Sequence, residues 1–150
     1  MLIIIHISHY RKKGEYTINF ELLPDYIEAQ ELDDYFIRFI QQESMVSSEE
    51  TCKDLEYIYE LSVRYWHTYK VMDINLKKQV SIYLIERCDY ESYEIMDIIT
   101  AIIPLLGLQE VWNKILKDKP KILNFRIVAL IDETIDDYGF NVEDPYSNMS

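Results

Sequence analysis

Residues 95–108, IMDIITAIIPLLGL, are the stretch around which the rest of the chain must be arranged. Nine of these fourteen residues are Ile, Leu or Met, and Asp97 carries the only charge. The stretch is shorter than the roughly 20 apolar residues that a membrane-spanning helix needs, and it is too apolar on all sides for a surface helix. We therefore predict a central helix that its neighbours cover on most of its surface.

The composition favours one helical domain. The chain has 150 residues, of which 49% are hydrophobic, so it can bury a sizeable core. It holds only three Gly and four Pro residues, whereas sandwiches and barrels need many turns of that kind. We expect helices joined by short connections.

Helical periodicity, together with residues that favour the ends of helices, divides the chain into helical segments. Asp73 is a good N-cap, Gly107 suits the position after a helix, and Gly139 ends the last helix. Pro24 suits a helix start, Pro104 would kink or end the central helix, and residues 47–50 (SSEE) form a capping box. Apolar residues at i, i+3 and i+4 predict helices over 25–42, 48–69, 74–87, 91–106, 109–117 and 121–138.

These segments predict a mainly α fold, an irregular or HEAT-like array of about six helices. No internal sequence repeat is clear, so both architectures remain open. We treat 1–150 as a single domain, with a helical body over 24–139 and a frayed tail over 140–150. Residues 1–22 are either a β-hairpin, with strands at 2–8 and 15–22 and a basic turn at 10–14, or a helical or loosely ordered lead-in.

The net charge of −12 narrows the classes of partner. It disfavours nucleic acid and anionic membranes, because both need a positive surface. It favours a basic partner, a cation, or simply solubility. The apolar N-terminus lacks a preceding basic region and a cleavage site, so we expect a cytoplasmic protein. Cys52 and Cys88 are 36 residues apart without a CxxC motif; two buried free thiols are favoured, and a disulfide remains open.

The acidic residues of the last predicted helix are placed where their charges destabilise the helix. They stack like charges at i and i+4, near the helix end where the macrodipole disfavours anions. Several unfavourable charge placements in one helix indicate a functional site. We predict a surface that binds Lys and Arg of a partner, and a solvated face is the alternative. The predicted partner-binding residues are Asp132, Glu133, Asp136, Asp137, Tyr138, Glu143 and Asp144.

No catalytic or metal motif stands out. Glu94 and Asp97 form an ExxD pair and Glu28 and Glu31 an ExxE pair, the pattern with which all-helical nucleotide pyrophosphatases hold Mg²⁺. The two pairs are separated by far more residues than in that family. A buried Asp97 bonded to a Tyr hydroxyl or to Arg87 is the other interpretation. We therefore expect no enzyme activity, no metal and no cofactor; the three histidines do not form a ligand pair.

In size, charge and Tyr content the chain resembles the immunity proteins of bacterial polymorphic toxin systems. It is most similar to the all-helical ones that are paired with contact-dependent growth inhibition toxins. The acidic segment 132–139 (DETIDDYG) and the aromatic segment 57–69 (YIYELSVRYWHTY) carry this resemblance.

The resemblance implies a protein that neutralises a cognate toxin, a basic nuclease of the RNase or tRNase type, by covering its active or substrate-binding surface. The acids would meet toxin Lys and Arg, while exposed tyrosines with Trp66 or Trp112 would fill pockets. It also implies a monomer or weak homodimer in the cytoplasm. Two alternatives are a helical adaptor or regulatory protein that binds a peptide, and an acidic mimic of nucleic acid.

Overall fold

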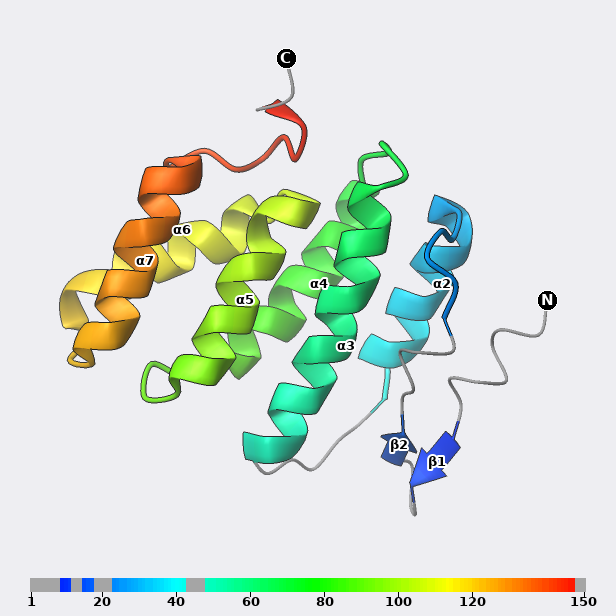
Figure 1. Ribbon diagram of the computed structural model, residues 1–150, viewed down its shortest axis with the longest axis horizontal. Helices are drawn as coiled ribbons and strands as arrows, with labels where there is room; N and C mark the ends of the chain where they lie inside the picture. The colour runs from blue at the N-terminus through cyan, green and yellow to red at the C-terminus, as the bar shows by residue number, and fades with distance from the viewer. Residues whose placement is uncertain (1–8, 12–14, 18–22, 43–47, 148–150) are drawn as a thin grey trace.

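The computed structural model describes residues 9–11, 15–17, 23–42 and 48–147 (Figure 1). Six α-helices form the body of this described part, which confirms the predicted mainly α fold. A short 3₁₀ helix, η2 (Lys119–Lys121), joins the last two. The helices are α2 (Ala29–Ile40), α3 (Ser48–Trp66), α4 (Ile74–Arg87), α5 (Tyr93–Leu106), α6 (Gln109–Asp118) and α7 (Phe125–Tyr138).

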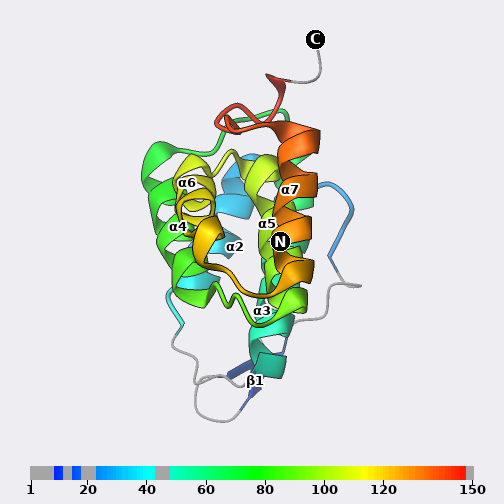
Figure 2. The same cartoon turned by 90° about the vertical axis from the view of Figure 1, so that its left-hand side faces the viewer.

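The helices form two layers. One layer holds α3, α5 and α7 side by side, and the other holds α2, α4 and α6 (Figures 1 and 2). Consecutive helices alternate between the layers, so each helix contacts the one two places along the chain. This is the arrangement of a helical array, in which every helix buries one apolar face between the layers.

Helix α5 lies at the centre of the array, as its sequence predicts. It contacts α3 and α7 in its own layer and α4 and α6 in the other. The side chain of Ser92 caps its start by accepting from the amide of Ile95, and Gly107 in the left-handed conformation ends it. Pro104 is buried in its last turn, two residues before that end. Its fully buried residues include Met96, Ile99, Ile102 and Ile103.

The prediction of a buried Asp97 is wrong. Its side chain is exposed and lies with Glu94 and Ala101 on one narrow strip of α5. These three positions are spaced at i, i+3 and i+7, so they share a face. That face is where the otherwise covered helix meets solvent. Asp97 therefore needs no buried partner.

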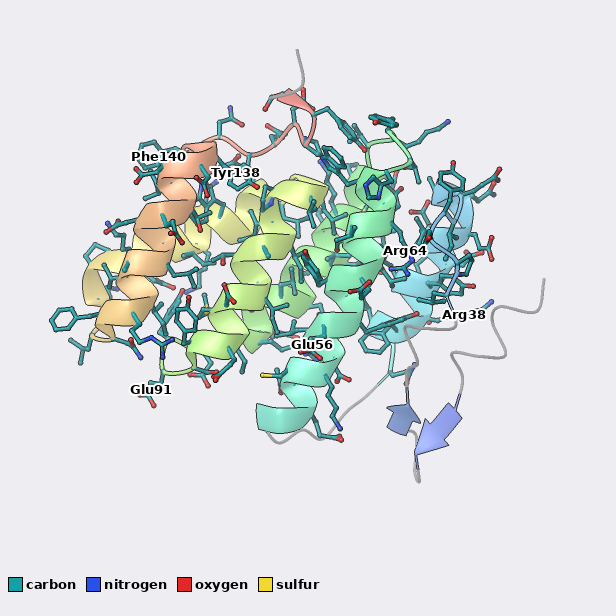
Figure 3. The ribbon with its side chains drawn as sticks, viewed as in Figure 1. Arg38, Glu56, Arg64, Glu91, Tyr138 and Phe140 are labelled. Atoms are coloured by element: carbon teal, nitrogen blue, oxygen red, sulfur yellow. The ribbon has the colours of Figure 1, made fainter. Side chains whose placement is uncertain are left out.

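Helix α2 begins later than the predicted start at residue 25. Leu23 and Ile27 are buried in the core, and the intervening chain is not helical. Arg64 reaches from α3 toward this segment (Figure 3) and its Nε donates to the carbonyl oxygen of Pro24 at 2.9 Å. Pro24 thus anchors an extended segment rather than starting a helix. Ser47 of the predicted capping box lies outside the described residues.

Helix α7 also begins late, at Phe125 instead of residue 121. Asn124 caps it, since its side chain accepts from the amides of Arg126 and Ile127. At other ends the sequence signals are confirmed: Asp73 caps α4 and Gly139 ends α7. These are local signals, in which the capping residue bonds within its own helix.

Two short strands precede the helices. Strand β1 (His9–Arg11) pairs antiparallel with β2 (Glu15–Thr17), and Tyr10 lies opposite Tyr16. Tyr10 and Arg11 therefore belong to a strand, not to the predicted turn at 10–14. The predicted strand residues 2–8 and 18–22 lie outside the described residues.

Candidate functional site

The outer face of α7 carries four of the predicted acids. Their side chains are all exposed, and the buried residues of α7 lie on its opposite face. Because α7 is the last helix of its layer, this face closes one end of the array (Figure 1). We call it the acidic face of α7; it consists of Asp132, Glu133, Asp136 and Asp137.

Among the described residues, one of these acids has a cation as partner. Asp132 forms an ion pair with Lys119 at 2.6 Å. Within the described part of the chain, Glu133, Asp136 and Asp137 form no ion pair. Uncompensated like charges at i and i+4 destabilise a helix modestly. The acidic face therefore lowers the stability of α7 and presents uncompensated negative charge to solvent.

Tyr138, Glu143 and Asp144 lie apart from the acidic face. Tyr138 continues the inward series Ile127, Ile131 and Thr134, so its ring projects over the end of α5. Asp144 and Tyr138 line the same pocket, whereas Glu143 lines a different one beside Lys77. The seven predicted residues thus occupy three neighbouring places rather than one surface.

The predicted frayed tail is wrong for residues 140–147. This segment, which we call the strap, runs from the end of α7 back across the array to the end of α3 (Figures 1 and 2). Within the strap, the side chain of Val142 is buried in the core. At its far end Tyr146 donates its hydroxyl to the carbonyl oxygen of Trp66 at 2.9 Å. Residues 148–150 lie outside the described residues.

Polar side chains of α6 hold the near end of the strap. Gln109 donates to the carbonyl oxygen of Phe140 at 2.8 Å and accepts from the amide of Val142 at 2.7 Å. Two bonds from one amide group fix the direction of the segment. Trp112, fully buried, donates its indole N–H to the carbonyl oxygen of Gly139 at 2.9 Å.

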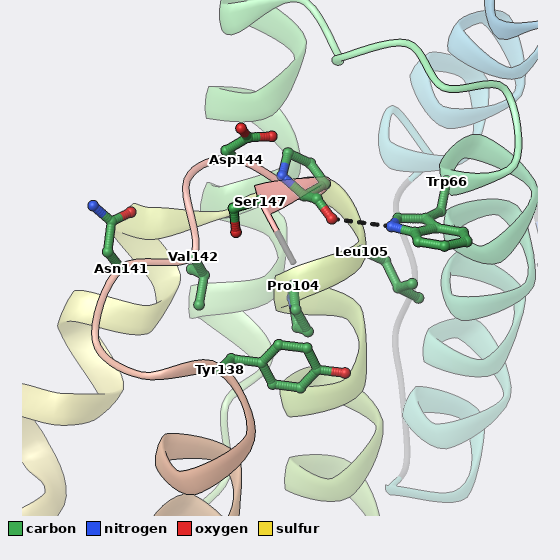
Figure 4. A pocket seen from close by; sticks show the side chains of 9 residues that line it. Trp66, Pro104, Leu105, Tyr138, Asn141, Val142, Asp144 and Ser147 are labelled. Carbon is green, nitrogen blue, oxygen red and sulfur yellow. Dashed lines mark hydrogen bonds between the residues drawn. The ribbon is translucent and has the colours of Figure 1, made fainter. Parts of the chain in front are cut away.

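The strap roofs a pocket between α3, α5 and α7. Its volume is about 200 Å³. Figure 4 shows Tyr138 reaching below Pro104 toward Leu105, while Trp66 closes the opposite side. The indole N–H of Trp66 is already used, because it donates to the carbonyl oxygen of Pro145 at 3.1 Å. The pocket is lined by Trp66, Pro104, Leu105, Tyr138, Asn141, Val142, Asp144, Pro145 and Ser147.

Both tryptophans differ from their predicted role as side chains that enter a partner. Trp112 is inside the core, and Trp66 is half-buried in a cluster with Tyr69 and Tyr146. Tyr69 and Tyr146 stack with their ring centroids 5.7 Å apart. Burial raises the pKa of Tyr146. The segment 57–69 therefore serves the core and the pocket wall more than an exposed surface.

Exposed aromatic residues flank the acidic face, and of these sequence reasoning named Tyr138 but missed Phe125 and Phe140. Phe125 is 86% exposed at the start of α7, with Leu123 just before it. At the other end of the helix Phe140 is 65% exposed and Tyr138 is 46% exposed (Figure 3). The signal was present in the periodicity, since Phe125 falls on the same side of α7 as Ala129 and Asp136.

The two predicted carboxylate pairs do not form a metal site. Glu94 and Asp97 are both exposed on α5, and no group of three or more His, Cys, Asp or Glu side chains in the described residues could hold a metal ion. Cys52 and Cys88 are free and only half-buried. Burial raises the pKa of the Cys88 thiol to about 11.

A second recess lies between α4 and α6. It has a volume of about 310 Å³, and Lys77 and Lys78 enter it beside the apolar residues Val71, Ile74 and Leu108. Burial lowers the pKa of Lys77, and the nearby acids Glu143 and Asp144 only partly offset this effect. The ammonium of Lys77 lies 3.5 Å from the carbonyl oxygen of Glu143.

Comparison of the chain with known proteins identifies no relative. No protein family, no curated protein and no solved structure matches the chain. Among the described residues, no helix is both long and apolar enough to cross a membrane.

Proposed function

We propose that this protein binds a basic protein partner through the acidic face of α7, and that it is an immunity protein which neutralises a cognate bacterial toxin. The toxin is expected to be a basic nuclease of the RNase or tRNase type that acts in the cytoplasm. One observation carries the proposal: Glu133, Asp136 and Asp137 are exposed without an ion pair in the described chain, and exposed aromatic residues flank them.

The charge of this face suits a nuclease. An enzyme that binds nucleic acid needs a positive surface for the phosphates. An inhibitor with a complementary negative surface would cover those cations and exclude the substrate. Opposite charges also speed association, and this effect falls with ionic strength. Net charge of −12 on the inhibitor strengthens the long-range attraction.

A tight complex needs apolar contacts as well as complementary charge, and the exposed aromatic residues supply them. Phe125 and Phe140 lie at opposite ends of α7, so the acidic face runs between two apolar contacts. Large side chains that become buried in an interface carry most of its binding energy and slow dissociation. We therefore expect the acids to govern the association rate and the two phenylalanines to govern the dissociation rate.

The test begins with a partner captured from the native host, together with the products of neighbouring reading frames. The expected partner is a basic protein that is lethal when produced alone and harmless when co-produced with this chain. The triple variant Glu133→Lys, Asp136→Lys, Asp137→Lys should slow association at low salt by tenfold or more, an effect on the scale of electrostatic steering. Surface plasmon resonance at two salt concentrations measures both rates.

A matched control is available at the other end of the array. Asp25, Glu28 and Asp34 are also exposed acids, and α2 lies farthest from α7 (Figure 1). Their conversion to Lys changes the net charge by the same amount. If this control slows association as much as the α7 variant, the effect comes from net charge and the acidic face is not the contact surface.

The helical adaptor is the second candidate, and the recess between α4 and α6 favours it. Exposed Ile74 and Val71 border this recess together with two lysines, a composition that fits an apolar peptide with acidic residues. The variant Ile74→Glu separates the two functions. It should leave toxin neutralisation intact, and loss of partner binding in this variant with no effect of the α7 charges would favour the adaptor.

A further inference from the structure

We infer that the pocket below the strap binds one arginine side chain of the partner. The inference rests on the proposed function, which supplies the positive charge of that partner. The sequence led us to expect that Trp66 would enter a pocket of the partner, whereas in this inference a side chain of the partner enters a pocket beside Trp66. Here Trp66 is part of a wall, and the partner provides the side chain that enters.

The walls of the pocket suit a planar cation on an aliphatic stem. The rings of Trp66 and Tyr138 stand on opposite sides, and Pro104 and Leu105 form the apolar surface between them (Figure 4). A guanidinium group stacks on the faces of Trp and Tyr, and the methylene groups of arginine cover apolar surface.

A single acidic side chain at the rim of the pocket favours a cation, although Lys77 of the neighbouring recess offsets part of its charge. Of the described residues that line it, Asp144 is acidic and none is basic. One carboxylate oxygen of Asp144 accepts from the amide of Tyr146 at 2.9 Å, which holds the side chain in place. Asp136 and Asp137 lie on the outer side of the same last turn of α7 whose inner side carries Tyr138, and they do not line the pocket.

The size of the pocket suits a side chain rather than a free small molecule. Its volume of about 200 Å³ is below the roughly 300–1,000 Å³ of sites for small molecules and cofactors. A single anchoring residue in a desolvated pocket is a frequent feature of protein interfaces. The pocket is adjacent to the acidic face, so one partner can contact both.

The test uses a blocked tripeptide, acetyl-Gly-Arg-Gly-amide, and the full-length protein. The chain has two tryptophans, so its NMR spectrum contains two indole N–H signals, which the variant Trp66→Phe assigns. The peptide should shift the Trp66 signal in a saturable way and leave that of the buried Trp112 unchanged. Matched peptides with glutamate or norleucine in place of arginine should have little effect.

Three variants locate the binding. Tyr138→Ala removes one aromatic wall and should abolish the saturable shift. Asp144→Asn keeps an oxygen that accepts from Tyr146 but loses the charge, so it should weaken binding by roughly fivefold, the scale of an accessible ion pair. Ile82→Ala is the control, because Ile82 is 58% exposed on α4 and does not line the pocket, and it should bind the tripeptide as the parent does.

Equal shifts with the norleucine and arginine peptides would overturn the inference, and so would the absence of a saturable shift with arginine. Failure of the proposed function gives a different result. In that case the arginine peptide still binds, but no basic toxin is captured. In the opposite case, charge reversal on α7 weakens toxin binding, whereas Tyr138→Ala changes neither toxin binding nor tripeptide binding. The proposed function then stands, and the assignment of the pocket is wrong.

Discussion

The indole Nε1 of Trp66 donates a hydrogen bond to the carbonyl oxygen of Pro145, a residue 79 positions later, at 3.1 Å. Trp112 makes the equivalent bond to Gly139, the residue directly before the strap (residues 140–147). Both tryptophans of the chain therefore hold the strap that roofs the pocket. The strap belongs to the folded array, and its integrity can be measured separately from that of the helices.

Replacing Trp66 with Phe should loosen the strap without unfolding the protein. The variant keeps an aromatic ring next to Tyr146 but loses the bond to Pro145, which costs about 0.5–1.5 kcal/mol. We expect faster amide hydrogen exchange in the strap and unchanged exchange in α5. Trp112→Phe should also lower global stability, because Trp112 is fully buried. Unchanged exchange in the strap of Trp66→Phe would contradict the role assigned to this bond.

Gly107 is expected to tolerate no side chain. It has a φ of +71°, and a β-carbon there would overlap the carbonyl oxygen of Glu143 in the strap. Gly107→Ala should lower the free energy of unfolding by about 2–4 kcal/mol, of which the backbone conformation accounts for about 1–2 kcal/mol and the overlap for the rest.

Two further variants separate these causes in urea titrations. Asn tolerates the left-handed conformation better than Ala, so rescue by Gly107→Asn would show that the backbone and not the overlap dominates. We expect no rescue. Gly139→Ala introduces a side chain with no neighbour within 4 Å, at a φ of +78° and a ψ of −160°. This backbone region is more strongly restricted to glycine than that of Gly107, so the variant gives an upper bound for a backbone cost without overlap.

Removing charge from the acidic face should stabilise the protein. Asp136→Lys with Asp137→Lys replaces anions near the C-terminal end of α7 with cations, which complement the macrodipole and pair with acids one turn earlier. The free energy of unfolding should rise by about 1 kcal/mol at low salt, and the gain should shrink at high salt. Thermal and urea unfolding measure both.

Asp132→Lys is the contrasting variant. It breaks the ion pair with Lys119, so no comparable gain is expected. A loss of stability in the Asp136 and Asp137 variant would mean that these acids have stabilising contacts in the free protein. The acidic face would then be structural, and the proposal of a docking surface would lose its main support.

Stability should decline above about pH 10, the ordinary pKa of tyrosine. Burial, then the bond to Asp33, raises the pKa of Tyr65, and burial, then the bond to Asp118, raises that of Tyr90. Burial raises the pKa of Tyr35 to about 12. These tyrosines ionise in the unfolded chain first, so their contribution is complete below pH 10 and is lost as the pH rises through their folded-state values.

The measurement is urea unfolding at intervals from pH 8 to pH 12. Tyr65→Phe and Tyr90→Phe should each make the decline less steep, because one group that titrates differently in the two states is removed. Tyr26→Phe serves as the control, since Tyr26 is 58% exposed. Identical slopes in all four proteins would show that other groups cause the alkaline loss.

Local interactions explain why much of the fold could be predicted. The central helix follows from the apolar residues of 95–108, and Asp73, Gly107 and Gly139 act on the helix they border. The exposed placement of the acids on α7 likewise follows from 3.6-residue periodicity. The late start of α2 could not be read in this way, because Pro24 is held by Arg64, which is 40 residues away in sequence.

The sequence by itself determined that the chain is helical, where most helices end and which side of α7 is acidic, since each of these depends on residues within one or two turns. Only the tertiary structure decided the course of the strap, the pocket beneath it and the exposure of Asp97. The strap is held chiefly by side chains that bond to backbone carbonyls 27 to 80 positions away. Every residue has such a carbonyl, so the sequence does not mark which one a tryptophan will reach.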